Sequence, residues 1–200
     1  MSEIKYGLIS EWDVSVIERT IDLIIASYPT DIIQVTEVGV YGGDTGKGIK
    51  EYINSKERQS FLTGVDNNRD GEKLRYSYDR LIIGDSFKVA DQIVNKSQHL
   101  IIIDACHCFG CVLEDYNAYV PKIKIGGFVA FHDAGKHIQK FKDYQHGDPL
   151  NEDSYISVRK ALTKIGLFEP NNPLGLNLHG VFDEGDENNP AGGFAVFRKM

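Results

Sequence analysis

The chain has little of what marks secreted, disulfide-bonded or membrane-spanning proteins. It contains only 3 cysteines in 200 residues, and they fall within six consecutive positions, Cys106 to Cys111. An odd and clustered set is a poor framework for disulfides. No apolar run approaches the ~20 residues needed to cross a bilayer, and no basic region followed by an apolar stretch opens the chain. We therefore expect reduced thiols, a soluble protein and a cytoplasmic location.

Basic residues are also scarce, since 22 Lys and Arg stand against 29 Asp and Glu, a formal net charge of -7. Nucleic-acid binding draws its affinity from cations that neutralise phosphates, so nucleic acid is an unfavourable partner. The length suits one hydrophobic core. We expect a single domain over residues 1–200, with an N-terminal helical segment over 1–30. The sequence is compatible with a homo-oligomer but specifies no oligomeric state.

Helical and strand-like segments alternate along the chain. Apolar side chains at near-helical spacing predict a helix over 13–28, which Pro29 ends, and the β-branched run Ile32–Val40 predicts a strand covered on both faces. Further strands are expected near 60–65, 80–83, 100–103 and 127–131, and further helices near 44–55, 72–79, 86–95 and 111–120. Because parallel strands need crossovers of this length, the pattern predicts an α/β fold with helices on both faces of a mostly parallel sheet.

The alternation loosens after Asp133. A polar stretch over 134–153 is too long for an ordinary connection, which favours a lid or a substrate loop. A helix is then expected over Ser154–Ile165, a strand near 167–169 and a final strand over Gly193–Arg198. We expect these last two strands to pair as a hairpin.

A glycine turn follows the first strand, at Gly39, Gly42 and Gly43. Glycine tolerates positive φ and lets a backbone approach a ligand closely, although tight turns without ligands use it too. The P-loop pattern and the G-x-G-x-x-G dinucleotide pattern each fail here at two positions. In the dinucleotide register Tyr41 and Asp44 stand where glycines belong, and Asp44 would repel a pyrophosphate at a helix N-terminus.

Carboxylates follow successive strands at Glu37, Asp66 and Asp85. Ligands of a doubly wound sheet bind outside the carboxyl ends of its strands, so these side chains are expected along one rim. A carboxylate accepts hydrogen bonds from a ribose diol or an amino group. Each aspartate alone is also compatible with a helix N-cap. Three carboxylates at the ends of successive strands favour a ligand with cationic or hydroxyl groups.

The order and spacing of four motifs resemble the class I S-adenosylmethionine-dependent methyltransferases. The motifs run E-x-G-x-x-x-G, G-D-S, D-x-x-H and G-G-x-x-x-x-D, as in a small group that includes sugar O-methyltransferases. Here they read Glu37–Gly43, Gly84–Ser86, Asp104–His107 and Gly126–Asp133. The resemblance implies a Rossmann-like seven-stranded sheet with an antiparallel last strand, and S-adenosylmethionine as the cofactor.

The same resemblance assigns roles to individual residues. Gly39 and Gly43 would approach the amino-acid part of the cofactor, Asp66 would hold the ribose hydroxyls, and Asp85 with Ser86 would lie beside the adenine. The expected cofactor-binding set is completed by Glu37, Asp44 and Asp104.

Methyl transfer needs in-line positioning and, for a hydroxyl acceptor, removal of its proton. The catalytic candidates are Asp104, His107 and His132; His107 is either a general base or a group that only caps its loop or donates to a carboxylate. Asp104, His132 and Asp133 match the metal ligands of related Mg²⁺-dependent enzymes, which usually carry a carboxylate or amide in the middle position. Metal-dependent and metal-free chemistry both stay open.

Cys106, His107, Cys108 and Cys111 invite a zinc hypothesis. A structural zinc site takes four ligands from two separated pairs, and the chain has no second cysteine pair, which favours packing of the thiols at a helix start. The sequence as a whole predicts methyl transfer to a hydroxyl of a small molecule such as a sugar or a phenol. The alternatives are a cofactor-binding or structural module without turnover, and a nucleotide-binding oxidoreductase.

Overall fold

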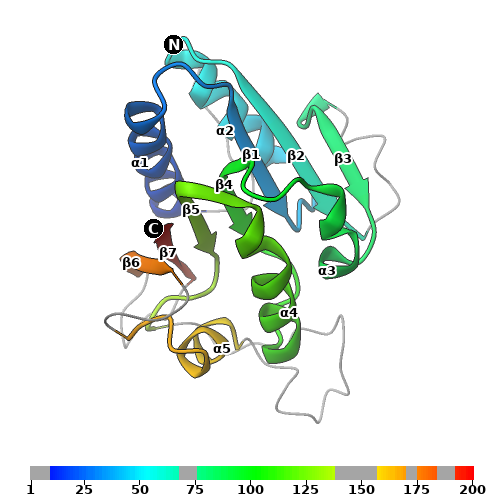
Figure 1. The fold of residues 1–200 in the computed structure, drawn as a ribbon, viewed down its shortest axis with the longest axis vertical. Helices are drawn as coiled ribbons and strands as arrows, with labels where there is room; N and C mark the ends of the chain where they lie inside the picture. Colours follow the sequence, from blue (N-terminus) through cyan, green and yellow to red (C-terminus); the bar gives the residue numbers. More distant parts are fainter. Residues whose placement is uncertain (1–9, 68–75, 138–156, 170–174, 184–191) are drawn as a thin grey trace.

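A seven-stranded sheet in the order β3-β2-β1-β4-β5-β7-β6 forms the centre of the protein (Figure 1). The structure, a computed structural model, describes residues 10–67, 76–137, 157–169, 175–183 and 192–200. The strands are β1 (Ile33–Val38), β2 (Ser60–Asp66), β3 (Arg80–Ile83), β4 (Gln98–Ile103), β5 (Ile123–Phe131), β6 (Leu176–Asp183) and β7 (Gly193–Lys199).

Strands β1 to β5 are parallel, whereas β7 pairs antiparallel with both β5 and β6. The chain runs outward from β1 through β2 to β3 and then returns to place β4 on the other side of β1. This reversal of direction is the topological switch point at which doubly wound sheets bind ligands. The predicted Rossmann-like sheet, mostly parallel with an antiparallel last strand, is confirmed.

Five α-helices and two short 3₁₀ turns, η2 and η3, are described. The helices are α1 (Glu11–Ser27), α2 (Asp44–Ser55), α3 (Ser86–Val89), α4 (Phe109–Tyr119) and α5 (Val158–Lys164), and the turns are η2 (Ala90–Gln92) and η3 (Val120–Lys122). Helix α1 begins with a capping box, in which Ser10 Oγ accepts from the Asp13 N–H and the Asp13 carboxylate accepts in return. Among the described helices, none is sufficiently long and apolar to traverse a bilayer.

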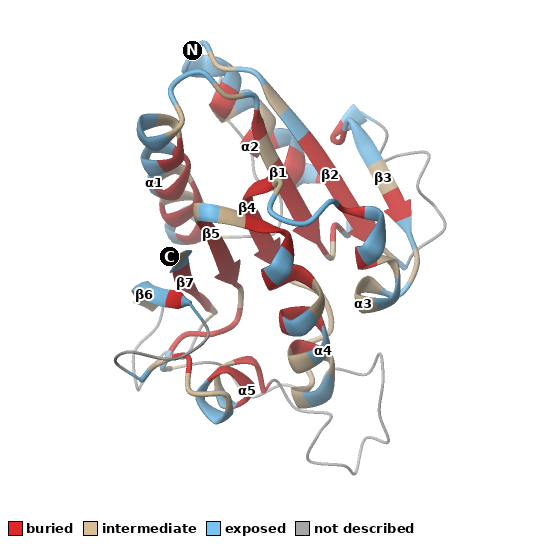
Figure 2. Ribbon diagram, viewed as in Figure 1, coloured by how far each residue is buried: buried red, intermediate tan, exposed pale blue. Residues whose placement is uncertain are grey.

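The two faces of the sheet carry separate hydrophobic cores. Along β4, Leu100 and Ile102 face the core covered by α1 and α2, while Ile101 and Ile103 face the core covered by α4 and α5. This alternation follows from the two-residue period of a strand. Figure 2 shows that the central strands β1 and β4 are buried over nearly their whole length. The expected helices on both faces are therefore present.

Several elements differ from their predicted extents. The helix expected near 86–95 is shorter, since α3 passes into η2 and Ile93 is already extended. Residues 72–75 of the helix expected near 72–79 lie outside the described residues, and 76–79 form no α-helix. A lid was expected over 134–153, and residues 138–153 of it also lie outside the described residues.

The strand predicted near 167–169 is wrong. Gly166, at φ +76, ends α5 in a turn, and the Leu167 N–H donates to the Leu162 carbonyl at 3.1 Å. Leu167 is fully buried, so its apolar character reflects the hydrophobic contact that accompanies a helix C-terminus. The hairpin partner of β7 is instead the later strand β6.

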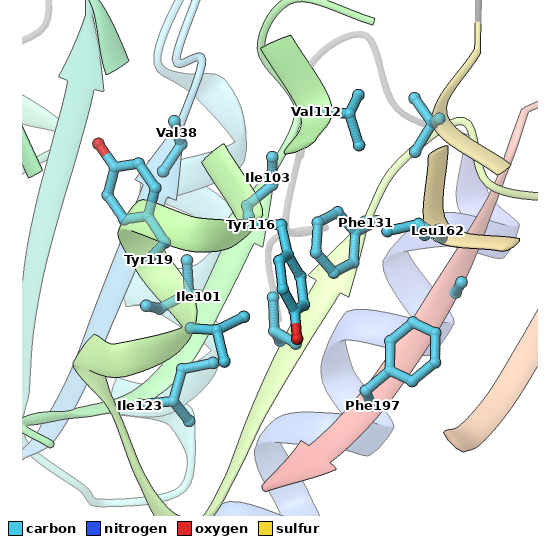
Figure 3. Close-up of a cluster of buried hydrophobic side chains, with 14 of the residues drawn as sticks. Val38, Ile101, Ile103, Val112, Tyr116, Tyr119, Ile123, Phe131, Leu162 and Phe197 are labelled. Atoms are coloured by element: carbon cyan, nitrogen blue, oxygen red, sulfur yellow. The ribbon is translucent and has the colours of Figure 1, made fainter. Parts of the chain in front are cut away.

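Aromatic packing joins the last strand to the core beneath α4 and α5 (Figure 3). The Phe197 side chain is fully buried, with its ring centroid 6.1 Å from that of Phe131 and 5.7 Å from that of Phe168. Phe197 therefore links the antiparallel end of the sheet to the core on this face.

Phe197→Ala should lower the free energy of unfolding by about 3–5 kcal/mol, because it removes a large buried side chain and leaves a cavity. Urea denaturation followed by circular dichroism measures the change. Val94→Ala is the control, since Val94 is 73% exposed and should change stability by less than about 0.5 kcal/mol. Equal effects of the two substitutions would contradict the assigned packing.

Candidate active site

The ends of β1 and β4 approach each other closely at Gly39. Its φ is +87, and a Cβ there would lie 2.1 Å from the Asp104 carbonyl oxygen. The Gly39 N–H donates to the Val65 carbonyl, and the Asp104 N–H donates to the Val38 carbonyl, both at 2.8 Å. Only glycine fits this position, where three strand ends are joined.

A pocket of about 730 Å³ opens at the carboxyl ends of β1, β2, β3 and β4. Five carboxylates line it: Glu37, Asp44, Asp66, Asp85 and Asp104. None of the described lining residues is Lys or Arg. The structure thus brings the expected carboxylates to one rim, together with Gly39, Gly43 and Ser86. Such a pocket attracts cationic and hydroxyl groups and repels phosphates.

Glu37 lies at the inner end of this pocket and is 4% exposed. Burial, together with the nearby charges of Asp104 and Asp66, raises the pKa of Glu37 to about 8, against a hydrogen bond from Tyr78 that lowers it. The Tyr78 hydroxyl donates to Glu37 Oε2 at 2.6 Å. The glutamic acid is therefore largely protonated at neutral pH in the cofactor-free protein.

The sequence did not point to Tyr78, because it falls in the segment expected to form a helix near 72–79. Its ring packs on the backbone of Gly46 and Gly64, where an added Cβ would lie 2.4 Å and 3.0 Å from the ring. In the sequence, the sole sign of this contact is that positions 46 and 64 are glycines. Only the fold shows that both glycines lie against the same tyrosine ring.

Asp66 anchors the glycine turn. Its Oδ2 accepts from the N–H groups of Val40 and Tyr41 at 2.9 and 3.1 Å. Tyr41 adopts a positive φ of 40, which is uncommon for a residue with a side chain, and its ring is 79% exposed at the pocket rim. Gly43, at φ +77, is the N-cap of α2, whose first residue is Asp44.

Ser86 is held from α4. Its hydroxyl donates to Asp115 Oδ1 at 2.5 Å, and the Tyr119 hydroxyl donates to the Ser86 carbonyl at 2.7 Å. Burial raises the pKa of Asp115 to about 6. Asp85 forms an exposed ion pair with Lys88 at 2.6 Å. The sequence pointed to neither α4 residue, since each resembles an ordinary helical position.

A second group of side chains lies at the ends of β4 and β5, next to the pocket. The donor atoms of Asp104, His107, His132 and Asp133 all lie within 4.8 Å of one another. His107 Nε2 is 3.3 Å from Asp104 Oδ1 and 3.1 Å from Asp133 Oδ2. His132 Nδ1 is 3.1 Å from Asp104 Oδ1 and 3.5 Å from Asp133 Oδ2. The structure therefore brings together all the predicted catalytic and metal-binding residues.

Opposite charges stabilise one another within this group. Burial alone would disfavour the charged form of His132, but Asp104, Asp13 and Asp133 raise the pKa of His132 well above its usual value. Burial would raise the pKa of Asp104, but His132 and His107 hold it below its usual range. Without a metal, the protonated His132 compensates the carboxylates.

Asp13 reaches this group from α1, 119 positions earlier in the chain than His132. Its side chain is buried, and Asp13 Oδ2 lies 3.4 Å from His132 Nε2. Asp13 Oδ1 is buried without a hydrogen-bond partner among the described residues, whereas His132 Nδ1 is paired with Asp104 Oδ1. The sequence suggested only a helix-start residue at position 13, so Asp13 was missed.

The three cysteines are free, as expected, and their sulfurs lie within 4.8 Å of one another. Cys106 Sγ is 3.4 Å from Cys108 Sγ, and Cys108 is the N-cap of α4. Burial raises the pKa of Cys111 to about 12, so the thiol stays protonated. Cys106 and Cys111 line the pocket, on the side nearest α4.

Comparisons with known proteins agree with this geometry. A methyltransferase-domain family matches residues 36–134, which contain the pocket and all four residues of the second group. No curated protein matches the chain significantly. The O-methyltransferase from Bacillus cereus, solved in complex with S-adenosylhomocysteine (SAH), is a similar structure, with a TM-score of 0.63 and 12% identity over 98% of this chain and 84% of that one.

Two further solved structures share the fold. The O-methyltransferase TomG from Streptomyces achromogenes, in complex with S-adenosylmethionine, has a TM-score of 0.58 and 11% identity over 96% of this chain and 91% of its own. The MycE methyltransferase, in complex with Mg, SAH and mycinamycin VI, has a TM-score of 0.56 and 17% identity over 97% of this chain and 50% of its own. With its seven-stranded sheet and the family match over residues 36–134, the chain contains an S-adenosylmethionine-dependent methyltransferase domain of the class I fold.

Proposed function

We propose that the protein transfers a methyl group from S-adenosylmethionine to a hydroxyl oxygen of a small molecule such as a sugar or a phenol. The observation that carries the proposal is an acidic pocket at the switch point, directly beside a group of imidazoles and carboxylates. A sulfonium and an ammonium suit the pocket, and an acceptor hydroxyl suits the imidazoles. O-methyltransferases among the similar structures support the choice of oxygen as the acceptor atom.

The proposed placement of the cofactor follows the pocket lining. The amino-acid part lies along Gly39 and Gly43, near Glu37, and its ammonium group would draw Glu37 into the ionised form. Asp66 accepts from the ribose hydroxyls, and the adenine lies beside Asp85 and Ser86. Asp44 and Asp104 complete the lining with negative charge at the two sides of the glycine turn.

The chemistry requires little beyond alignment and one proton acceptor. The acceptor oxygen attacks the methyl carbon of the sulfonium, the carbon–sulfur bond breaks, and SAH departs as a neutral thioether. His107, which lines the pocket, takes the hydroxyl proton as the oxygen–carbon bond forms. Asp104 and His132 hold the charge balance around His107 and orient the acceptor.

Mg²⁺ is a poor match for the second group. The MycE structure contains Mg, but Mg²⁺ prefers octahedral sites made of oxygen atoms and water. Here two imidazoles stand among the carboxylate oxygens, and His132 Nδ1 is already paired with Asp104 Oδ1 at 3.1 Å. We therefore derive no step of the reaction through Mg²⁺.

Calorimetry and a turnover assay together test the proposal. SAH should bind with one site per chain, and NAD should bind far more weakly, because its pyrophosphate would enter an acidic pocket. A library of sugars and phenols, with SAH release as the readout, then tests transfer to oxygen. Tighter binding of NAD would favour an oxidoreductase, and SAH binding without turnover on any hydroxyl would favour a module that only binds the cofactor.

Asp66→Asn should weaken SAH binding by about 1–3 kcal/mol, because an amide replaces a charge-assisted acceptor for the ribose hydroxyls. Isothermal titration calorimetry measures the affinity. Asp79→Asn is a matched control, since the Asp79 carboxylate also accepts from a backbone N–H, that of Leu62 at 2.8 Å, but lies outside the pocket lining. An unchanged affinity in folded Asp66→Asn would remove the ribose assignment.

Glu37→Gln should alter the pH dependence of stability. Between the ordinary pKa of 4.5 and the folded value of about 8, the folded protein holds a proton that the unfolded chain has lost. Wild-type stability should therefore fall across this window, by at most about 1.4 kcal/mol per pH unit, and the neutral amide should remove that contribution. Urea unfolding at several pH values between 4.5 and 8 measures the difference between variant and wild type.

Tyr78→Phe serves as the control for the link between Glu37 protonation and the pH dependence of stability. It removes the hydrogen bond to Glu37 but leaves the carboxyl group ionisable and buried, so the pH slope should persist. Wild type and Glu37→Gln with parallel stability profiles would mean that Glu37 is ionised in the folded protein at neutral pH.

His107→Gln should reduce turnover by about 10²–10⁴-fold, the usual contribution of a general base, while leaving SAH affinity nearly unchanged. Single-turnover kinetics with a preformed cofactor complex isolate the chemical step. His179→Gln is the control, because His179 is exposed on β6, where its ring lies beside those of Phe128 and Phe182 and outside the pocket lining. Full activity in His107→Gln would assign the proton to another acceptor.

A further inference from the structure

We propose that Cys106, Cys108 and Cys111 form a binding site for a trivalent, three-coordinate metalloid such as the arsenic of arsenite. These residues, which we call the thiol cluster, are the 3 cysteines of the chain, and their sulfurs lie within 4.8 Å of one another. The cluster takes no part in the proposed methyl transfer. Its sulfurs are also separate from the donor atoms of the second group.

The number of donors is the first argument. Structural zinc sites take four ligands, and iron–sulfur clusters are usually held by four cysteines. His107 lies between two of the cysteines in the sequence, but its Nε2 faces Asp104 Oδ1 at 3.3 Å and Asp133 Oδ2 at 3.1 Å. The imidazole therefore belongs to the second group, and the thiol cluster offers three sulfurs to an ion that needs three.

The distances between the sulfurs fit such an ion. Cys106 Sγ lies 3.4 Å from Cys108 Sγ, and the third sulfur is within 4.8 Å of both. A pyramidal centre with bonds to sulfur of about 2.3 Å, the usual length of a metal–thiolate bond, has edges of about 3.5 Å between its sulfurs. All three cysteines are partly exposed, so the sulfurs are accessible to a small solute.

Charge selects a trivalent centre. Cys106 and Cys111 line the pocket together with its five carboxylates, and none of the described lining residues is Lys or Arg. Three thiolates around a monovalent ion leave two excess negative charges, and around a dication they leave one. Around a trivalent centre they leave none. Because added negative charge is unfavourable beside carboxylates, the pocket favours the neutral complex.

The binding reaction balances without a further reactant. Arsenous acid, the form of arsenite at neutral pH, carries three hydroxyl groups on its arsenic atom. As each sulfur–arsenic bond forms, one arsenic–oxygen bond breaks, and the thiol proton leaves with the hydroxyl group as water. Three thiols thus release three water molecules. Arsenic keeps its oxidation state, so no oxidant or reductant is consumed, and the net charge of the site is unchanged.

Backbone hydrogen bonds hold the segment that carries the thiol cluster. Asp104, which precedes it, donates its N–H to the Val38 carbonyl at 2.8 Å. The His107 carbonyl accepts from the Ser157 N–H at 2.8 Å, and the Cys108 carbonyl accepts from the Val112 N–H at 3.1 Å in the first turn of α4. The three sulfurs are therefore held near one another before any ion binds, which reduces the entropic cost of binding.

The position of the thiol cluster couples it to the cofactor pocket. Cys106 and Cys111 belong to the wall of the pocket that the proposed function assigns to S-adenosylmethionine. An arsenic atom bound to both sulfurs occupies space at that wall, so arsenite and SAH should each weaken the binding of the other, by equal factors. This coupling rests on the proposed function, whereas arsenite binding itself does not.

Arsenite is the probe, added to the reduced chain without cofactor. Native mass spectrometry should show one arsenic per chain, with a mass gain of one arsenic atom less three hydrogen atoms. A thiol titration should then find no free thiol. Arsenic X-ray absorption spectroscopy should give three sulfur neighbours and no oxygen neighbour. Excess Zn²⁺ should leave the arsenic bound.

Single serine substitutions at the three cysteines test each donor with little change of shape. Cys106→Ser, Cys108→Ser and Cys111→Ser should each weaken arsenite binding by about 10²–10⁴-fold, the usual gain when a further contact becomes intramolecular. Circular dichroism checks that the variants are folded. SAH affinity is measured on the same proteins by calorimetry.

A relocated thiol is the matched control. Val94 is 73% exposed, and its carbonyl accepts from Ser97 Oγ just before the amino end of β4, whereas the thiol cluster follows the carboxyl end. Val94→Cys alone should bind one arsenic and keep one free thiol. The double variant Cys111→Ser with Val94→Cys has three thiols in the chain but two in the cluster, so it should bind arsenite as weakly as Cys111→Ser.

Four results would overturn the site: two sulfur neighbours with one oxygen neighbour in the wild type, displacement of arsenic by Zn²⁺, unchanged arsenite affinity in a single serine variant, or restored affinity in the double variant. SAH binding that arsenite leaves unaltered would reject the coupling to the pocket. Failure of SAH to bind would reject the proposed function and leave the arsenite stoichiometry standing.

Discussion

The close approach of β1 to β4 governs the geometry of the site. Gly39 permits it, because any side chain there would collide with the backbone at Asp104. The contact places the ends of two central strands side by side at the point where the sheet reverses its order. Glu37 and Asp104 then face the same pocket from neighbouring strands. The pocket and the second group adjoin at this contact, since Asp104 and His107 belong to both.

The pocket and the second group, which lie side by side at the strand ends, balance their negative charge in different ways. In the pocket, Glu37 avoids excess negative charge by holding a proton, with Tyr78 as its hydrogen-bond donor. At the ends of β4 and β5, the protonated His132 balances the carboxylates instead. The same acidic field that favours a sulfonium therefore costs stability when the pocket is empty. Such costs at binding sites are common, because a site is shaped for its ligand and not for the free protein.

The accuracy of the sequence predictions depended on how strongly a segment was buried. Continuous apolar runs such as 100–103 mark central strands clearly, since both faces are covered. β6 was missed because it is an edge strand in which Asn177, Leu178 and His179 are exposed, so polar and apolar side chains show no clear pattern. Leu167 and Phe168 resemble a strand, yet they close the end of a helix. In each case a local sequence pattern was interpreted without knowledge of the helices and strands that pack against that segment.

The sequence by itself determined the α/β class, the rim of carboxylates and the motif residues His107 and Asp133, because strand ends in a parallel sheet share one edge. Only the tertiary structure decided which distant side chains complete the site. Tyr78 packs on glycines of two other elements, and Asp13 meets His132 from the first helix. Contacts of this kind arise from the packing of layers, for which local periodicity contains no information.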